Sequence, residues 1–160
     1  MAVRQVREMG DEVLNKVSKE VKVEDKACDL IRNVMFETMY EANGVGLAAP
    51  QVGILKRIVV IDVGEGPIIL INPVILETAG EQTGDEGCLS VPGKAGQVTR
   101  PYYVKVKALN ENMEEVIYEG EELLARAFCH EIDHLDGHLY VELVEGELHD
   151  AVYQEYEEGE

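Results

Sequence analysis

Two histidines four residues apart, His130 and His134, are the side chains of this sequence best suited to chemistry. Glu131 directly follows the first of them. On an α-helix, a spacing of four residues places both imidazoles on one face, about one turn apart, so both can bind one metal ion while the glutamate lies beside it. The pattern predicts a hydrolytic metal site in which Glu131 is the general acid and base.

A hydrolytic metal site has three protein ligands and one open position for water, so a third ligand is needed. A histidine six residues after His134 would complete a metzincin site, but that position is Tyr140. A later glutamate would complete a thermolysin-like zinc endopeptidase, and the candidates are Glu142, Glu145 and Glu147. They lie so soon after His134 that little chain remains for a second helix packed over the first.

Cys88 is the better candidate for the third ligand. It lies among turn residues between Gly84 and Gly93, outside any periodic apolar pattern, and we expect it in a loop. A thiolate beside two neutral imidazoles suits zinc, ferrous iron, nickel or cobalt and disfavours magnesium and calcium. Cys28 follows the apolar period of a predicted helix instead and is expected in the core. A structural metal site remains an alternative, although it usually has four protein ligands and His149 is distant.

A glycine-rich segment from Gly44 to Gly53 follows the first long predicted helix. Its Gly-x-Gly-x-x-Ala spacing is similar to a dinucleotide-binding fingerprint, but that fingerprint follows a strand and opens a helix, whereas this segment runs into Pro50. The glycines permit close approach of the backbone to a ligand. Gln51 offers an uncharged amide donor to a developing oxyanion.

The elements that must position these residues follow from hydrophobic periodicity. Helices are predicted at residues 11–18, 24–42 and 121–137, and strands at 57–63, 67–72, 74–78, 103–109 and 116–118. This order is typical of an α+β fold. We expect antiparallel β-sheets packed around a central metal-binding helix, with N-terminal helices and a short C-terminal helix or tail.

Length and charge limit the class of protein. The chain has 160 residues, 46% of them hydrophobic, which predicts one domain spanning residues 1–160, with an acidic tail from about residue 146. The net charge of -18 argues against DNA and anionic membranes as partners. The sequence has no apolar run of eighteen residues or signal-like N-terminus, and its three cysteines suggest a reducing compartment. We therefore expect a cytoplasmic protein.

Three segments, in this order, closely resemble the signature motifs of peptide deformylase: Gly44 to Gly53, Glu86 to Ser90, and His130 to His134. The resemblance covers roughly residues 1–145. It implies a hydrolase that removes the formyl group from N-formyl-methionyl peptides and nascent chains and releases formate. It also implies one divalent ion per chain, natively Fe²⁺, for which Zn²⁺, Ni²⁺ or Co²⁺ substitutes.

The resemblance implies a role for each matched residue. The metal ligands would be Cys88, His130 and His134, and the acid/base Glu131. The Gln51 side chain and the Leu89 backbone N–H would stabilise the oxyanion. The substrate-binding candidates are Val45, Gly46 and Gly87 for the peptide backbone, and Val45, Leu123 and Ala127 for the methionine side chain. We also expect an ion pair between Arg100 and Asp133 to brace the metal-binding helix.

The sequence departs from the family pattern at three places. His138 and Tyr140 stand where residues vary in the family, and we expect His138 to be exposed or to lie just outside the metal ligands. Many bacterial members carry a basic residue a few positions after the cysteine loop, and here Lys94 is the candidate for that position. Some members dock on the ribosome through a basic C-terminal helix. Residues 141–160 are acidic, so we expect proximity to the ribosome without direct docking through the tail.

Overall fold

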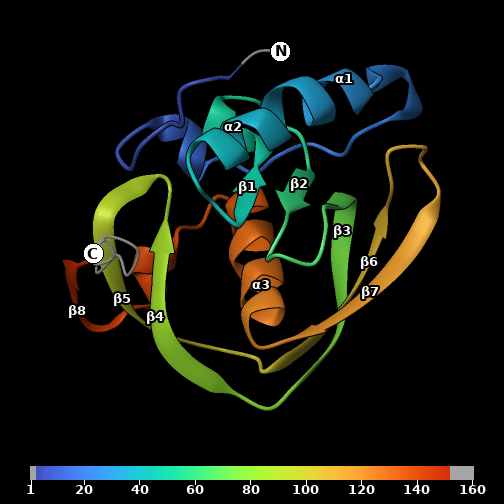
Figure 1. Ribbon diagram of the computed structural model, residues 1–160. Helices are drawn as coiled ribbons and strands as arrows, with labels where there is room; N and C mark the ends of the chain where they lie inside the picture. The colour runs from blue at the N-terminus through green and yellow to red at the C-terminus, as the bar shows by residue number, and fades with distance from the viewer. Residues whose placement is uncertain (1–2, 152–160) are drawn as a thin grey trace.

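The computed structural model describes residues 3–151 and contains two antiparallel sheets on either side of helix α3 (Leu123–Leu135) (Figure 1). The larger sheet has the order β1 (Gly46–Ala48), β2 (Ile58–Ile61), β3 (Ile68–Ala79), β6 (Tyr103–Leu109), β7 (Glu115–Glu121). The smaller sheet has the order β4 (Gln82–Cys88), β5 (Val91–Arg100), β8 (Glu145–Asp150). This arrangement confirms the predicted α+β fold with a central helix.

The N-terminal region is mostly short helical turns followed by one longer helix. The turns are η1 (Glu12–Asn15) and η2 (Val23–Asp25), and the longer helix consists of α1 (Cys28–Leu30), the π-helical segment η3 (Ile31–Met35) and α2 (Phe36–Glu41). The helix predicted at residues 24–42 was correct in type, but its predicted start lies four residues before the observed start at Cys28. Its apolar period of 3.6 gave no sign of the π-helical segment. The remaining short helices are η4 (Ala49–Val52) and η5 (Tyr140–Leu143).

Strand β2 is a part of the larger sheet that is buried on both faces. Its four residues are all apolar and all buried. Val59 and Ile61 pack in the cluster that contains α3, whereas Ile58 and Val60 pack in the cluster that contains the N-terminal helix. Because successive side chains of a strand point to opposite faces, a continuous apolar run is what such a two-sided position requires.

Helix α3 is surrounded on nearly every side. Ten of its thirteen residues are buried, including charged ones, so its polar side chains must find partners inside the protein. The helix follows β7 directly and packs its apolar residues against the larger sheet. None of the helices within residues 3–151 is long and apolar enough to span a membrane.

Several local predictions were wrong, for identifiable reasons. Residues 67–72 and 74–78 form the single strand β3, because Asn72 and Pro73 are accommodated by a register shift instead of a turn. Cys28 is exposed, not in the core, since it lies in the first turn of the helix, where its Sγ donates to the backbone oxygen of Glu111 in the β6–β7 loop.

The segment around Cys88 and the start of the tail form strands that the sequence analysis missed. Cys88 is the last residue of β4 and does not lie in a loop. Residues 145–150, assigned to a C-terminal helix or acidic tail, form β8 and pair with β5. All six residues of β8 are exposed, so backbone pairing with β5, and not an apolar face, holds the strand in place. The rest of the tail, residues 152–160, lies outside the described residues.

Candidate metal centre

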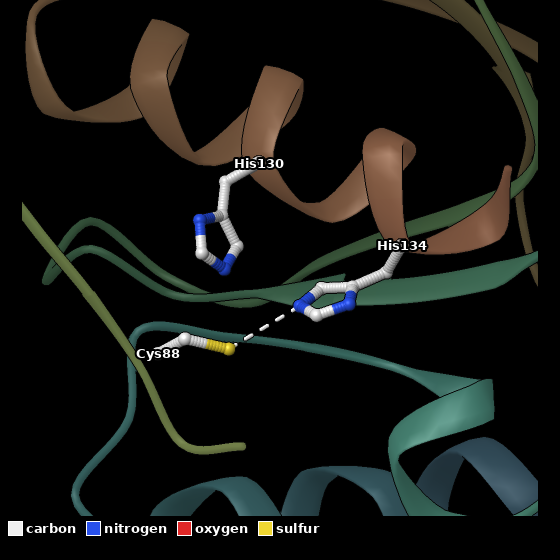
Figure 2. A group of neighbouring side chains, drawn as sticks. All are labelled: Cys88, His130 and His134. Atoms are coloured by element: carbon white, nitrogen blue, oxygen red, sulfur yellow. Dashed lines mark hydrogen bonds between the residues drawn. The ribbon is translucent and has the colours of Figure 1, made fainter. Parts of the chain in front are cut away.

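Cys88, His130 and His134 point toward one another between β4 and α3 (Figure 2). One donor atom from each lies within 4.8 Å of the others, and Cys88 Sγ lies 3.4 Å from His134 Nε2. A tetrahedral ion with bonds of about 2.3 Å to sulfur and about 2.05 Å to nitrogen separates those two ligand atoms by about 3.5 Å. The donor set and its spacing therefore fit a divalent ion of the zinc or ferrous type.

Local structure explains how Cys88 and His130, which are 42 positions apart in sequence, come together. The spacing of four residues on α3 places the two imidazole centroids 5.0 Å apart. On the smaller sheet, the β4–β5 pairing shifts register between Glu86 and Cys88, immediately before the chain turns into β5. Such irregularities redirect a side chain at the end of a strand, and here the Cys88 thiol is directed to the helix.

Glu86 braces the first histidine, and the sequence analysis missed this role. Its buried carboxylate accepts a hydrogen bond from His130 Nδ1, which leaves Nε2 of that ring for a metal. Arg100 donates to it from Nε at 3.1 Å and from Nη2 at 2.7 Å, and Arg126 donates from Nη1 at 2.9 Å. Arg100 also pairs with Asp133 at 2.8 Å, which confirms the predicted ion pair on the helix.

Two signals in the sequence could have identified Glu86 and Arg126 as neighbours of the metal ligands. Glu86 lies two residues before Cys88, so on a strand both side chains share a face. Arg126 lies four residues before His130, so on a helix both share a face.

His130 also packs against Tyr140, the residue at the position of the metzincin ligand. The buried ring of Tyr140 stacks on His130 with centroids 5.9 Å apart.

The pKa values of the buried groups Glu86, His134 and His130 are shifted in different directions. Burial alone would raise the pKa of Glu86, but hydrogen bonds from His130 and Arg100 outweigh it and hold that pKa well below its ordinary value. Burial lowers the pKa of His134 well below its ordinary value, so this ligand is neutral. Burial also opposes charge on His130, yet Glu131, Cys88 and Glu86 raise its pKa, so metal binding at this ring displaces a proton.

Glu131 lies beside the three donor atoms, and within the described part of the chain its carboxylate makes only a long ion-pair contact, to His130. Its Oε2 lies 4.0 Å from His130 Nε2, and within residues 3–151 its buried Oε1 has no hydrogen-bond partner. Burial, assisted by the charge of Glu86, raises the pKa of Glu131 to about 7 against the opposing effects of His130 and Arg100. A carboxyl group that titrates near neutral pH can both accept and return a proton.

Gln51 lies close to Cys88, in η4. Its side-chain amide is buried and oriented by two groups: Oε1 accepts from the Ala48 backbone at 2.9 Å, and Nε2 donates to Ser90 Oγ at 3.0 Å. The same Nε2 lies 3.6 Å from Cys88 Sγ. An amide N–H is therefore held close to the metal ligands, where it can reach an oxygen bound nearby.

One cleft of about 760 Å³ brings these residues together with the predicted substrate-binding residues. Its lining includes the acid/base and oxyanion candidates, two of the three metal ligands and all five substrate-binding candidates: Gln51, Cys88, Leu89, His130, Glu131, Val45, Gly46, Gly87, Leu123 and Ala127. Leu123 is 49% exposed, so it is available to a ligand and does not pack in the core. His134 lies behind the cleft wall, among buried residues.

Residues proposed for the alternative sites lie elsewhere. The thermolysin-like candidates Glu142, Glu145 and Glu147 are exposed and do not line the cleft. His138 is exposed, as expected, and interacts with Glu142 at 3.1 Å. His149 is exposed on β8, where its Nε2 lies 3.2 Å from Asp85.

Comparison with known proteins gives one consistent family. Residues 3–148 match the family model described as polypeptide deformylase. The peptide deformylase of Agathobacter rectalis is 70% identical over 159 residues, covering 99% of this chain and all of the relative. The peptide deformylase of Lachnoclostridium phytofermentans is 63% identical and is covered completely by this chain.

Solved structures agree with the sequence relatives. The peptide deformylase from Thermotoga maritima superposes with a TM-score of 0.87 at 43% identity, over 91% of this chain and all of the other. A peptide deformylase from Synechococcus elongatus in complex with actinonin superposes with a TM-score of 0.84 at 44% identity, over 88% of this chain and 78% of the other.

Proposed function

This chain belongs to the polypeptide deformylase family, and on that premise we propose that it is a metal-dependent hydrolase that removes the formyl group from formyl-methionine at the N-terminus of nascent polypeptides. The observation that carries the proposal is the convergence of the donor atoms of Cys88, His130 and His134 beside a cleft that is also lined by Glu131, whose carboxyl can take up a proton. The reaction adds water across an amide and yields formate and a free amine.

Cys88, His130 and His134 would hold the ion, with one position open to the cleft. When bound, the ion would supply Lewis acidity that polarises the formyl carbonyl and makes water nucleophilic near neutral pH. We propose Fe²⁺ as the native ion because the resemblance to the family implies it, with Zn²⁺, Ni²⁺ or Co²⁺ as substitutes, since a thiolate and two imidazoles suit all four ions.

Glu131 carries the proton through the reaction. Its carboxylate accepts a proton from the attacking water and returns it to the amine nitrogen as the C–N bond breaks. Two features of the pocket support this role: Glu131 is 5% exposed, and burial raises the pKa of its carboxyl to about 7. The formyl carbon then leaves as formate, and the peptide leaves with its free N-terminal amine.

Gln51 and Leu89 would stabilise the charge that develops on the carbonyl oxygen. The amide of Gln51 is already oriented by Ala48 and Ser90, which hold the donating Nε2 close to the metal ligands. The Leu89 backbone N–H follows Cys88 directly and is the second donor in the proposal.

The substrate would lie extended along the cleft. Val45, Gly46 and Gly87 offer backbone groups to the peptide, and Val45, Leu123 and Ala127 offer apolar surface to the methionine side chain. Val45 and Leu123 are 42% and 49% exposed, so a bound methionine would bury apolar surface that is otherwise in contact with water.

The proposal assigns the catalytic function to residues 1–160 as a single domain, in the cytoplasm, where formylated nascent chains are made. Direct docking on ribosomal RNA through the C-terminal segment is not part of it, because Glu145–Asp150 is an acidic strand paired with β5 and not a basic helix.

A formate-release assay on formyl-Met-Ala-Ser tests the proposal, with protein purified anaerobically and its metal content measured. We expect formate release by the wild type and a loss of at least a hundredfold in kcat for Glu131→Gln, with the metal retained. The matched control is Glu147→Gln, which makes the same change on exposed β8. A wild type that is inactive with a full complement of metal would falsify the proposal, as would a fully active Glu131→Gln.

Replacing Cys88 separates the proposal from its rivals. A deformylase of this type should lose its ion, or bind it far more weakly, in Cys88→Ala, whereas a zinc endopeptidase that uses a later glutamate would keep it. A site that holds its metal with no exchangeable water would instead favour a structural role.

A further inference from the structure

Residues 4–11, near the start of the chain, are hydrogen-bonded to both elements that carry the proposed oxyanion donors. The backbone N–H of Arg7 donates to the carbonyl oxygen of Gln51 at 2.7 Å, and that of Met9 donates to the carbonyl oxygen of Ser90 at 2.8 Å. Gln51 lies in η4, and Ser90 lies in the turn between β4 and β5. Figure 1 shows this dark blue segment beside that turn. We call residues 4–11 the N-terminal strap.

The two bonds complete a closed ring of contacts. On the inner side of the ring, Gln51 Nε2 donates to Ser90 Oγ at 3.0 Å. On the other side, Arg7 and Met9, which are only two residues apart, bind the backbone oxygens of the same two residues. Gln51 and Ser90 are therefore joined twice, once through their side chains and once through the strap. Neither can shift far relative to the other without breaking a hydrogen bond.

Further contacts fix the strap along its length. The backbone N–H of Arg4 donates to Thr38 Oγ1 of α2 at 3.0 Å. The Arg7 guanidinium lies 2.8 Å from the carboxylate of Asp11, the N-cap residue of η1. It also lies over Gly53, the C-cap residue of η4, where a Cβ would be 2.7 Å from Nη2 of the arginine. The strap is thus fixed at α2, η4 and η1.

Apolar packing contributes little to the strap, since most of its side chains are in water. Six of its eight residues are exposed, and the other two, Val6 and Asp11, are half-buried. Met9 is 50% exposed, so its side chain buries little apolar surface. The course of the strap past η4 and the β4–β5 turn therefore depends mainly on its hydrogen bonds.

We propose that Arg7 and Met9 are positioning residues for the oxyanion donors. Their backbone N–H groups set the separation between η4 and the β4–β5 turn, so that Gln51 Nε2 and the Leu89 N–H donate to one carbonyl oxygen. This inference rests on the proposed function, in which those two groups are the donors. A donor is effective at about 3 Å from the oxygen that gains charge, so a small shift weakens it. Neither Arg7 nor Met9 lines the cleft, so they act through the donors and not on the substrate.

Met9→Pro removes one of the two N–H groups and is compatible with the local backbone. Met9 is the second residue of a turn that is closed by a hydrogen bond of 3.0 Å from the Asp11 N–H to the Glu8 oxygen. The third residue, Gly10, has a φ of 106°. These are the features of a type II turn, which favours proline at its second position. Met9→Pro should therefore fold and lose the bond to the carbonyl of the β4–β5 turn.

Steady-state formate release from formyl-Met-Ala-Ser measures the effect, with metal content and thermal unfolding recorded for each variant. We expect Met9→Pro to lower kcat by about tenfold and to change KM by less than about twofold, because the donors act mainly in the transition state. The conservative variant Met9→Ala keeps the N–H and should retain the kcat of the wild type. Arg7→Pro and Arg7→Ala give the same comparison for the bond to Gln51.

A double variant distinguishes positioning from a general loosening of the fold. Independent effects on kcat multiply, whereas effects on one shared group do not. Since Gln51→Ala already removes one donor that the strap positions, its combination with Met9→Pro should lose less activity than the product of the two single losses.

Amide hydrogen exchange gives a readout that does not depend on catalysis. The N–H groups of Arg7 and Met9 should exchange more slowly than that of Glu8, which makes no hydrogen bond within residues 3–151.

The outcomes separate this inference from the proposed function. Equal kcat values for the proline and alanine variants, in folded protein with its metal, would overturn the positioning role and leave the deformylase proposal intact. Losses that multiply in the double variant, or equally rapid exchange of the Arg7, Glu8 and Met9 amides, would also overturn it. Should Met9→Pro fail to fold, the Arg7 pair and the exchange rates decide the question. No formate from the wild type would overturn the proposed function itself.

Discussion

A methyl group on the Cα of Gly46 would lie 2.5 Å from Oε2 of Glu131 and 3.0 Å from its carboxyl carbon. Contacts this short do not occur between a Cβ and its neighbours, so the carboxylate occupies the space that a side chain at position 46 would fill. The glycine of β1 thus sets where the buried carboxylate of α3 lies, across an interface between two elements far apart in sequence.

Gly46→Ala should therefore displace Glu131 and lower kcat by about a hundredfold, the scale of loss expected when a reacting group is misplaced by about 1 Å. The metal content should stay at one ion per chain, because the ligands are not touched. Steady-state formate release and metal analysis make the measurement. Gly84→Ala is the matched control, since its Cβ would lie 3.6 Å from Arg126, an ordinary contact. Equal activity of the two variants would refute the positioning role.

Gln51→Ala should lower kcat by about a hundredfold or more with little change in KM, because an oxyanion donor acts mainly in the transition state. Ser90→Ala removes the hydroxyl that accepts from Gln51 Nε2 and should cause a smaller loss, since the Ala48 contact still orients the amide. Steady-state kinetics on formyl-Met-Ala-Ser decide the point. A rise in KM at constant kcat would assign Gln51 to substrate binding instead.

Glu86→Gln should destabilise the protein by about 3–5 kcal/mol, because it leaves the buried Arg100 and Arg126 without their carboxylate. The pKa of Glu86 lies below its unfolded value of 4.5, so the folded state binds fewer protons. The stabilisation is therefore present above about pH 5 and is lost as the pH falls. Urea unfolding at pH 7 and pH 4 should show a shallower acid dependence for Glu86→Gln than for the exposed control Glu147→Gln.

The three cysteines should react with a thiol reagent in a fixed order. Cys28 is exposed and should label in the native protein, Cys88 should label only after the metal is chelated, and Cys129 only after unfolding. Burial raises the pKa of the Cys129 thiol to about 11, so the folded protein holds little thiolate there at pH 8. Counting labelled thiols by mass spectrometry tests the order, and Cys28→Ser should remove the first event. Labelling of Cys88 at the same rate with and without chelator would argue against its role as a ligand.

The sequence was sufficient to predict the elements whose local patterns are strong. Strand β6 has its predicted bounds, residues 103–109, and the metal-binding helix was placed within two residues at each end. The donor triad was predictable because residues four apart lie on the same face of a helix, and because thiolate and imidazole ligands prefer the same ions.

The parts that were missed depend on partners distant in sequence. Residues 82–100 contain glycine, proline and charged residues that suggest turns, yet they form β4 and β5 because the two strands pair along their length and bury Glu86 with Arg100 between them. Strand β8 is exposed throughout and has no apolar period, so only its pairing with Lys94, Ala95 and Gln97 of β5 makes it a strand. Glu86 was missed as a brace for His130 because the strand that aligns it with Cys88 was not predicted.

The division of the ligands between two sheets has a consequence for local unfolding. Two donors lie on a helix packed into the larger sheet, whereas the third belongs to the smaller sheet. A bound ion is therefore a cross-link between two regions that could otherwise open separately, added to the ion pairs of Glu86. After chelation, amide hydrogen exchange should accelerate in β4, β5 and β8 and change least in α3, so that metal content would set which part of the protein is protected.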